Sequence, residues 1–194
     1  MPQAGFDGSA VHQRLARERE PRLGYSGGDV RSWQAELRPR VRECLGQWPE
    51  ERVALNVRSL WDRETDLGRI EKVVFTAEPG ADVPAYVCTP GGEEPPYDWF
   101  ICVQGHSTGM HNSIAVDAAD ETRTIEVEGD RDFALGAMRR GVAALCIEQR
   151  SFGERSSRPD THLSCNPDGL HALHLGRTLA GERVFDVDRA LDYL

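Results

Sequence analysis

The clearest pattern along the chain is a series of apolar runs separated by polar and glycine-rich segments. Residues 99–103 and 142–147 are continuous apolar runs, which are typical of strands buried on both faces of a sheet. Residues 70–76 and 83–89 are rich in β-branched side chains, and residues 78–82 between them have the composition of a turn. The pattern therefore predicts a hairpin followed by two buried strands.

The first third of the chain has a different pattern. Residues 1–28 are rich in Gly, Arg and Glu with little periodicity, and we expect a mobile leader there. Asp29 suits the position before a helix, and residues 29–66 are predicted as a helical segment. Pro39 removes one backbone donor inside this segment, so we expect a kink or two short helices. The apolar stripe of the segment is formed by Val30, Trp33, Leu37, Val41 and Leu45.

Two further helices are predicted around the second buried strand. Asp130 suits the position before a helix over residues 131–140, and Gly141 suits the position after its end. A last helix is predicted over about residues 179–194. One face of that helix carries Val184, Val187, Leu191 and Leu194.

This order of elements predicts an α/β fold over residues 67–194. Strands that alternate with helices favour a parallel sheet with helices on both faces. The preceding hairpin makes the sheet mixed.

Composition and charge exclude several classes of function. The formal net charge is −9, which argues against nucleic acid or an anionic membrane surface as a partner. No segment approaches the roughly 20 apolar residues of a membrane span. The five cysteines are an odd number, and the first 20 residues lack the apolar core of a secretory signal. We therefore expect reduced thiols and a cytoplasmic location.

Residues 105–109 match the pattern G-x-S-x-G, in which a serine stands on a sharp turn between a strand and a helix. The predicted strand precedes this copy, but the residues after it are a poor helix. In α/β-hydrolases the acid and the histidine follow the serine on later strands. Only one clear strand follows Ser107, which counts against Ser107 as the nucleophile. Ser107 is therefore kept only as an alternative nucleophile.

The same segment also suits an oxyanion loop. The loop after this strand supplies a backbone N–H to the oxyanion hole in such folds. Donors aimed at the developing negative oxygen stabilise the transition state by several kcal/mol. The His106 amide is our candidate donor, and Gly105 allows a turn and the close approach of substrate.

Four segments resemble, in the same order, those of bacterial α/β-hydrolases related to acetyl xylan esterases and dienelactone hydrolases. The resemblance extends over roughly residues 30–194. The segments are residues 101–111, residues 130–141, residues 147–154 and residues 176–194.

The resemblance implies the N-terminal portion of an α/β-hydrolase-type mixed sheet, and hydrolysis of a small carboxylic ester such as an acetyl ester, without a cofactor. The family places its serine, acid and histidine after the last of these helices, so we expect this chain to be a truncated part that lacks all three. Gln104 replaces the usual histidine, and Glu148 stands where an aspartate is common. Neither change removes a backbone donor.

Arg150 follows the second buried strand, at the end where ligands bind in open α/β sheets. We therefore name it a candidate substrate-binding residue, with a loop-anchoring salt bridge as the alternative. No metal site is expected, because the spacing of Cys165, His171 and His174 matches no compact zinc template.

Two other functions stay open. Half of such a sheet leaves a strand edge unpaired, and that edge could bind a partner: a complementing C-terminal half or a second copy in a homo-oligomer. In that case the chain is a non-catalytic module. Alternatively, the chain is a compact esterase with Ser107 as its nucleophile.

Overall fold

Two units make up the computed structural model, which describes residues 7–106, 109–158, 160–161 and 163–194. The first unit, Met1–Cys44, contains helices α1 (Ala10–Glu18) and α2 (Val30–Cys44). Helix α1 lies within the predicted leader and was not expected. The second unit, Leu45–Leu194, holds the sheet and all the other elements.

Helix α2 begins as predicted. The Asp29 carboxylate accepts hydrogen bonds from the backbone amides of Arg31 and Ser32, at 3.1 and 3.2 Å. A kink or two short helices were expected at Pro39; the second expectation is wrong, because α2 continues through the proline. Ala35, whose carbonyl loses its helical donor to the proline, is exposed, so water can hydrate that carbonyl.

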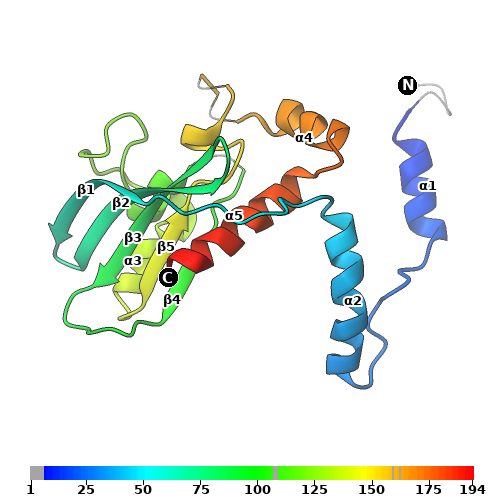
Figure 1. The fold of residues 1–194 in the computed structure, drawn as a ribbon, viewed down its shortest axis with the longest axis horizontal. Helices are drawn as coiled ribbons and strands as arrows, with labels where there is room; N and C mark the ends of the chain where they lie inside the picture. The colour runs from blue at the N-terminus through cyan, green and yellow to red at the C-terminus, as the bar shows by residue number, and fades with distance from the viewer. Residues whose placement is uncertain (1–6, 107–108, 159, 162) are drawn as a thin grey trace. The chain divides into compact units, whose positions relative to one another are not determined.

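A five-stranded sheet forms the centre of the second unit (Figure 1). The strand order is β1-β2-β3-β5-β4, and only the pair β4 and β5 is parallel. The sheet is therefore mixed, as predicted, and mostly antiparallel. The strands are β1 (Arg58–Thr65), β2 (Gly68–Glu78), β3 (Ala81–Pro90), β4 (Trp99–Cys102) and β5 (Ala143–Ile147).

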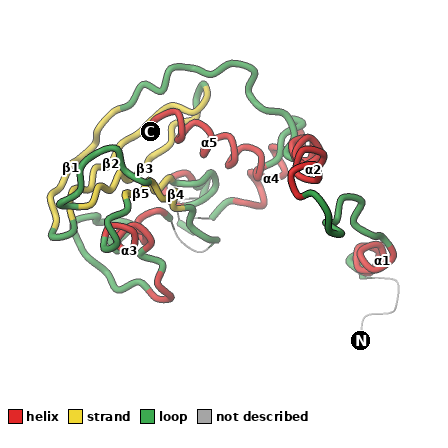
Figure 2. The backbone as a smooth tube through the Cα atoms, turned by 90° about the horizontal axis from the view of Figure 1, so that it is seen from below, coloured by secondary structure: helices red, strands yellow, loops and turns green. Residues whose placement is uncertain are grey.

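Helices α3 (Phe133–Met138) and α5 (Leu179–Tyr193) lie on opposite faces of this sheet (Figure 2). Every residue of β5 is buried, and alternate side chains enter two different cores. Cys146 packs with α3 on one face, whereas Leu145 packs with Phe185 of α5 on the other. The side chains of β5 therefore alternate between the two faces of the sheet, and a run in which every residue is apolar does not show this alternation.

The predicted hairpin is confirmed as β2 and β3, which pair antiparallel with a bulge near Thr76. The predicted helical segment 29–66 is helical only through Cys44. Residues 58–65 instead form β1, which pairs with β2 and extends the sheet. Their polar, largely exposed side chains carry no strong strand signal. Backbone pairing with β2 therefore determines that these residues form a strand.

Strand β4 differs from its prediction. The apolar run predicted burial on both faces, but Phe100 is 47% exposed and Val103, just after the strand, is 45% exposed. The reason is position, because β4 is the last strand of the sheet and pairs only with β5. Its outer edge has no neighbour among the described residues.

The helices after β4 also differ in detail. Asp130 does not cap α3: it has a φ of +51° and ends a short turn, η2 (Glu128–Asp130), while α3 begins after Asp132. Helix α3 ends at Met138, two residues earlier than predicted, and Gly141, with a φ of +71°, lies in the turn that follows. The remaining elements are η1 (Met110–Ile114), η3 (Gly153–Arg155) and α4 (Cys165–His174).

Helix α5 presents an unexpected face to the sheet. Its buried side chains include Phe185, Asp186 and Arg189, whereas Leu191 of the predicted apolar stripe is 55% exposed. The charged residues can be buried because each has partners of opposite charge. No helix in the described part of the chain is long and apolar enough to cross a membrane.

The N-terminus of α5 requires close backbone packing at Gly181. Thr178 caps the helix, accepting from the Gly181 amide at 2.9 Å and donating to the Leu45 carbonyl at 2.8 Å. A Cβ at position 181 would lie 2.0 Å from that carbonyl oxygen. We expect Gly181→Ala to lower the free energy of unfolding by about 2 kcal/mol, the cost of overpacking against backbone, measured by urea denaturation.

Gly169→Ala is the matched control. Gly169 also lies in a helix, but a Cβ there would meet no atom within 4 Å. This substitution should leave stability unchanged or raise it by up to about 1 kcal/mol, because alanine favours the helix. Equal destabilisation by both variants would contradict the packing explanation.

Candidate functional site

The candidate site lies where two strands end side by side. Because β4 and β5 are parallel and Cys102 pairs with Cys146, the loops that follow them leave the same edge of the sheet. The loop after β4 contains the predicted oxyanion segment, and the loop after β5 begins at Glu148. Ligands bind at this edge in open α/β sheets. Ser107 lies outside the described residues.

Buried thiols support the two strands below these loops. Cys102 and Cys146 are buried, as the sequence predicted. A hydrogen bond to Cys146 and burial raise the pKa of the Cys102 thiol, and burial raises the pKa of Cys146. Both thiols therefore stay neutral and act as small core residues.

The start of the loop after β4 is held by glutamine side chains. Gln104 is buried, and its Nε2 donates to Ser113 Oγ at 2.6 Å and to the Arg131 carbonyl at 3.0 Å. The Gln104 carbonyl in turn accepts a hydrogen bond from Gln149 Nε2. The start of the loop is thus tied at Gln104 both to the η1 turn and to the loop after β5.

His106, the candidate oxyanion donor, lies in the middle of this loop. Its ring packs on Phe152 with the centroids 5.5 Å apart, and Phe152 is only 3% exposed. The Arg183 guanidinium covers Phe152 at 4.1 Å from the ring centroid. Among the described residues none accepts a hydrogen bond from the His106 amide, and His106 itself is exposed.

Gly105 is exposed, and a Cβ at this position would meet no atom within 4 Å. Its φ is not in the left-handed region. The backbone conformation alone therefore does not require glycine here. The open space beside Gly105 is compatible with a bound molecule, and its substrate-binding role remains a prediction.

Glu148 holds the end of the loop. The Met110 amide donates to both carboxylate oxygens of Glu148 at 3.2 Å. Glycines make room for this carboxylate, because a Cβ at Gly109 or Gly153 would lie 2.5 or 2.1 Å from Glu148 Oε2. Two glycines from different loops thus enclose one carboxylate.

The Glu148 carboxylate also borders a small cavity of about 160 Å³. Burial raises the pKa of Glu148 to about 7, against its ordinary 4.5, although the Met110 amide opposes this. The cavity is lined by Tyr86, Met110, His111, Glu121, Glu148 and Glu154, among others. A carboxyl that titrates near neutral pH therefore lies directly beside the candidate oxyanion loop.

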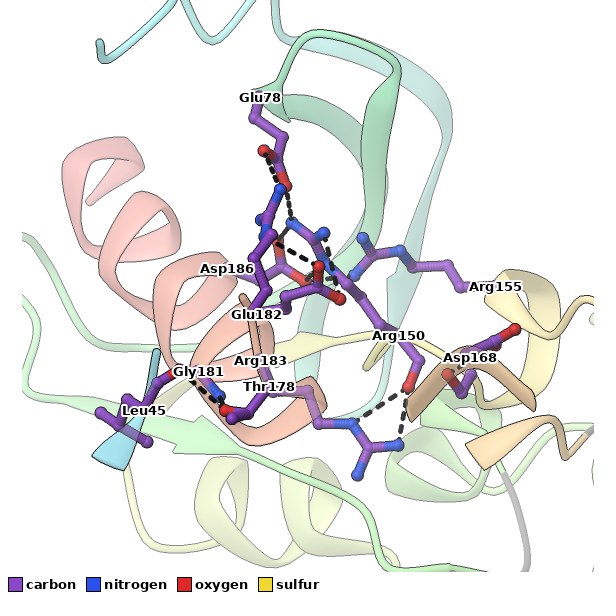
Figure 3. Close-up of polar contacts among 12 residues, drawn as sticks. Leu45, Glu78, Arg150, Arg155, Asp168, Thr178, Gly181, Glu182, Arg183 and Asp186 are labelled. Atoms are coloured by element: carbon purple, nitrogen blue, oxygen red, sulfur yellow. Dashed lines mark hydrogen bonds and ion pairs between the residues drawn. The ribbon is translucent and has the colours of Figure 1, made fainter. Parts of the chain in front are cut away.

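The candidate substrate-binding residue Arg150 is engaged in ion pairs (Figure 3). Its guanidinium lies 2.8 Å from Asp186 and 2.6 Å from Glu78. Arg155 also pairs with Asp186, at 2.6 Å, and the Asp186 side chain is fully buried. These contacts agree with the alternative interpretation of Arg150, a salt bridge that anchors its loop. Contact between Arg150 and substrate remains a prediction.

The acid at the other end of this network lies on β2. Burial opposes ionisation of Glu78, but hydrogen bonds from Arg177 and Arg150 hold the pKa of Glu78 below its ordinary value. Glu78, Arg150 and Asp186 come from β2, the loop after β5, and α5 (Figure 3). The network therefore joins the sheet, this loop and the helix that covers the sheet.

Gly105, His106 and Arg150, the site residues expected from the sequence, follow the two parallel strands. Residues 147–154 also resemble the family, but no role in holding the loop was expected for Gln149 or Phe152. The available sequence signal was the glycine at position 153, because glycine allows another group to approach the backbone closely. In the structure Gly153 has a φ of +45°. Among the described residues no group of three His, Cys, Asp or Glu side chains could hold a metal ion.

This arrangement defines a mixed α/β protein in which the loops after two parallel strands lie together at one edge of the sheet. One solved structure, from Bacteroides fragilis and provisionally assigned as an acetyl xylan esterase, has a similar fold with a TM-score of 0.80. The two chains are 18% identical, and the match covers 97% of this chain. A likeness at this identity shows a shared fold and does not transfer an activity.

The match covers 50% of the Bacteroides fragilis chain, so this chain spans half the length of that protein. A scan of protein-family models gives no match, and a comparison with curated proteins gives none either.

Replacement of Asp186 tests the ion-pair network. Among the described residues Asp186 is the only carboxylate partner recorded for Arg155. Asp186→Asn should therefore leave a buried guanidinium without its counter-charge, and we expect a loss of about 3–5 kcal/mol in the free energy of unfolding, measured by urea denaturation. Asp62→Asn removes an exposed pair with Arg69 and should change stability little. Similar losses in both variants would contradict this assignment.

The raised pKa of Glu148 predicts a pH-dependent stability. A carboxyl whose pKa is higher in the folded state loses stability as pH rises from about 4.5 to about 7. Each pH unit in that window is worth about 1.4 kcal/mol, so the full effect is about 3 kcal/mol. Relative to the wild type, Glu148→Gln should therefore gain stability between pH 5 and pH 8, as measured by denaturation at each pH. A constant difference between the two proteins would contradict the raised pKa.

Proposed function

We propose that this chain is the N-terminal part of a serine-dependent esterase of the α/β-hydrolase type. Its substrate is a small carboxylic ester, with acetyl esters as the first class to test. The single observation that carries the proposal is the His106 amide: it lies in the loop after a parallel strand and, among the described residues, donates to none. The esterase-like fold of the neighbour supports it.

The chemistry of ester cleavage explains what the loop would contribute. A serine attacks the ester carbonyl, and the carbonyl oxygen becomes negative in the tetrahedral intermediate. Backbone N–H groups aimed at that oxygen stabilise the transition state more than the ground state. In this proposal the His106 amide is one such donor, and Gln149, Phe152 and Glu148 keep it in place.

The nucleophile in this proposal comes from outside the described sheet. The outer edge of β4 has no partner among the described residues, and Phe100 and Val103 are exposed beside it. We propose that a further parallel strand pairs there and carries the serine elbow, with the acid and histidine on later strands. The Bacteroides fragilis neighbour, twice as long as the matched part, supports this arrangement.

One other function is favoured by the same edge. An unpaired strand with exposed apolar side chains recruits another chain, so the chain can act as a non-catalytic module that binds a complementing half or a second copy. Leu191 of α5 and Leu170 of α4, which are both exposed, add apolar surface to this unit. Sedimentation as a monodisperse monomer at micromolar concentration would count against this alternative.

Activity assays distinguish these functions. The chain alone should release no more nitrophenol from 4-nitrophenyl acetate than its Ser107→Ala variant does, because the nucleophile is elsewhere. Turnover that is lost in Ser107→Ala would overturn this proposal and favour the compact esterase.

The oxyanion role is tested in the active protein that includes this chain. His106→Pro removes the amide donor and should lower kcat by about 10²- to 10³-fold, as for loss of one oxyanion donor. His106→Ala is the matched control, because it keeps the N–H. It also loses the ring contact with Phe152, so it should lose some activity but much less than His106→Pro. Equal losses of kcat in the two variants, or none in His106→Pro, would exclude the backbone role.

A further inference from the structure

The loop after β5 holds the loop after β4 at three points, and one of them is a buried carboxyl. Gln149 binds the start of the loop, Phe152 supports the His106 ring, and Glu148 binds the Met110 amide. On the side of the loop after β5, the first two contacts are made by an amide and a phenyl ring, which do not ionise. The third involves a carboxyl that is 2% exposed.

We propose that Glu148 is a positioning residue, whose ionised carboxylate fixes the backbone at Met110 and thereby the direction of the His106 amide, and whose protonation releases that hold. The role rests on the proposed function, because the direction of this amide matters only if it serves as an oxyanion donor. The step itself is a proton exchange with solvent: the carboxylate takes up one proton below the transition and returns it above.

The geometry explains why the charge of this group affects the loop. An ionised carboxylate accepts hydrogen bonds about twice as strong as those of a neutral acceptor. Both Glu148 oxygens lie 3.2 Å from the Met110 nitrogen, so protonation of either oxygen weakens a shared contact.

The groups around Glu148 set the pH of the change. Burial and the nearby charge of Glu154 raise the pKa of Glu148, while the Met110 amide, the Glu154 amide and the Arg155 charge lower it. The result is a pKa of about 7. The titratable and charged groups that face this carboxyl come from β2, β3, the loop after β4, the loop before α3, and η3: they are Lys72, Tyr86, His111, Glu121, Glu154 and Arg155.

The effect reaches His106 through a short stretch of backbone. His106 and Met110 belong to one loop, whose start is fixed by Gln149 and whose end is fixed by Glu148. When the hold at Met110 weakens, the contacts at Gln104 and at the His106 ring remain. A donor that must point at one oxygen atom is sensitive to such a change.

The test is an NMR titration of the 194-residue chain between pH 5 and pH 9, without substrate. We expect the amide proton of Met110 to follow a one-proton transition with its midpoint near pH 7, and the His106 amide to show a component with the same midpoint. In Glu148→Gln this component should disappear from both amides. The difference between the wild-type and Glu148→Gln titrations therefore isolates Glu148.

Glu154→Gln is the matched control. Glu154 lines the same cavity, but its carboxylate binds Lys72 at 2.9 Å. The transition at Met110 should remain in this variant and move to lower pH, because Glu154 no longer repels the ionised Glu148. Loss of the transition in Glu154→Gln would overturn the assignment to Glu148.

Two wild-type results would also overturn the proposal. The first is a Met110 amide that does not titrate, which would show that Glu148 does not hold it. The second is a Met110 transition that His106 does not share, which would show that the loop does not transmit it. Neither measurement needs ester cleavage, so failure here is separate from failure of the esterase assay.

Discussion

The structure depends on burying charged side chains at the carboxyl end of β5. Moving an ionised group out of water is costly unless an opposite charge or a hydrogen-bond donor replaces the water. Asp186 meets this requirement with two arginines, and Glu148 meets it with the Met110 amide. These compensations tie the loops after β4 and β5 to each other and to α5, so the position of the candidate site follows from the need to satisfy buried charge.

The parts of the fold that were predicted from sequence are those set by local chemistry. The turn composition at residues 78–82 determines the hairpin, and five consecutive apolar residues identify β5. The α5 helix was also predicted, but its buried face was not. Hydrophobic spacing alone favours Leu191, whereas the structure buries Asp186 instead, because the partners that compensate this carboxylate come from a distant loop that the helix pattern does not contain.

The same distinction applies to the candidate site. The Gly105–Gly109 motif marked the loop, because a pattern of small residues beside a serine is recognisable along the chain. The residues that hold the loop could not be found in this way, since Gln149 and Phe152 are ordinary until strand pairing brings them close. Strand β4 shows the complementary limit. Its apolar run correctly indicates side chains that favour burial, but it contains no information about which element covers the edge.

Gln104 and Glu148, the two departures from the esterase pattern, both have structural roles. Gln104 has no imidazole to offer, but its amide reaches Ser113 and Arg131 and fixes the strand end. Glu148 is one methylene longer than aspartate, and its carboxylate occupies space in which a side chain at residue 109 or 153 would clash. The longer acid and the two glycines therefore depend on one another. Substituting either glycine would displace the carboxylate from Met110, even though neither glycine contacts substrate in the proposed chemistry.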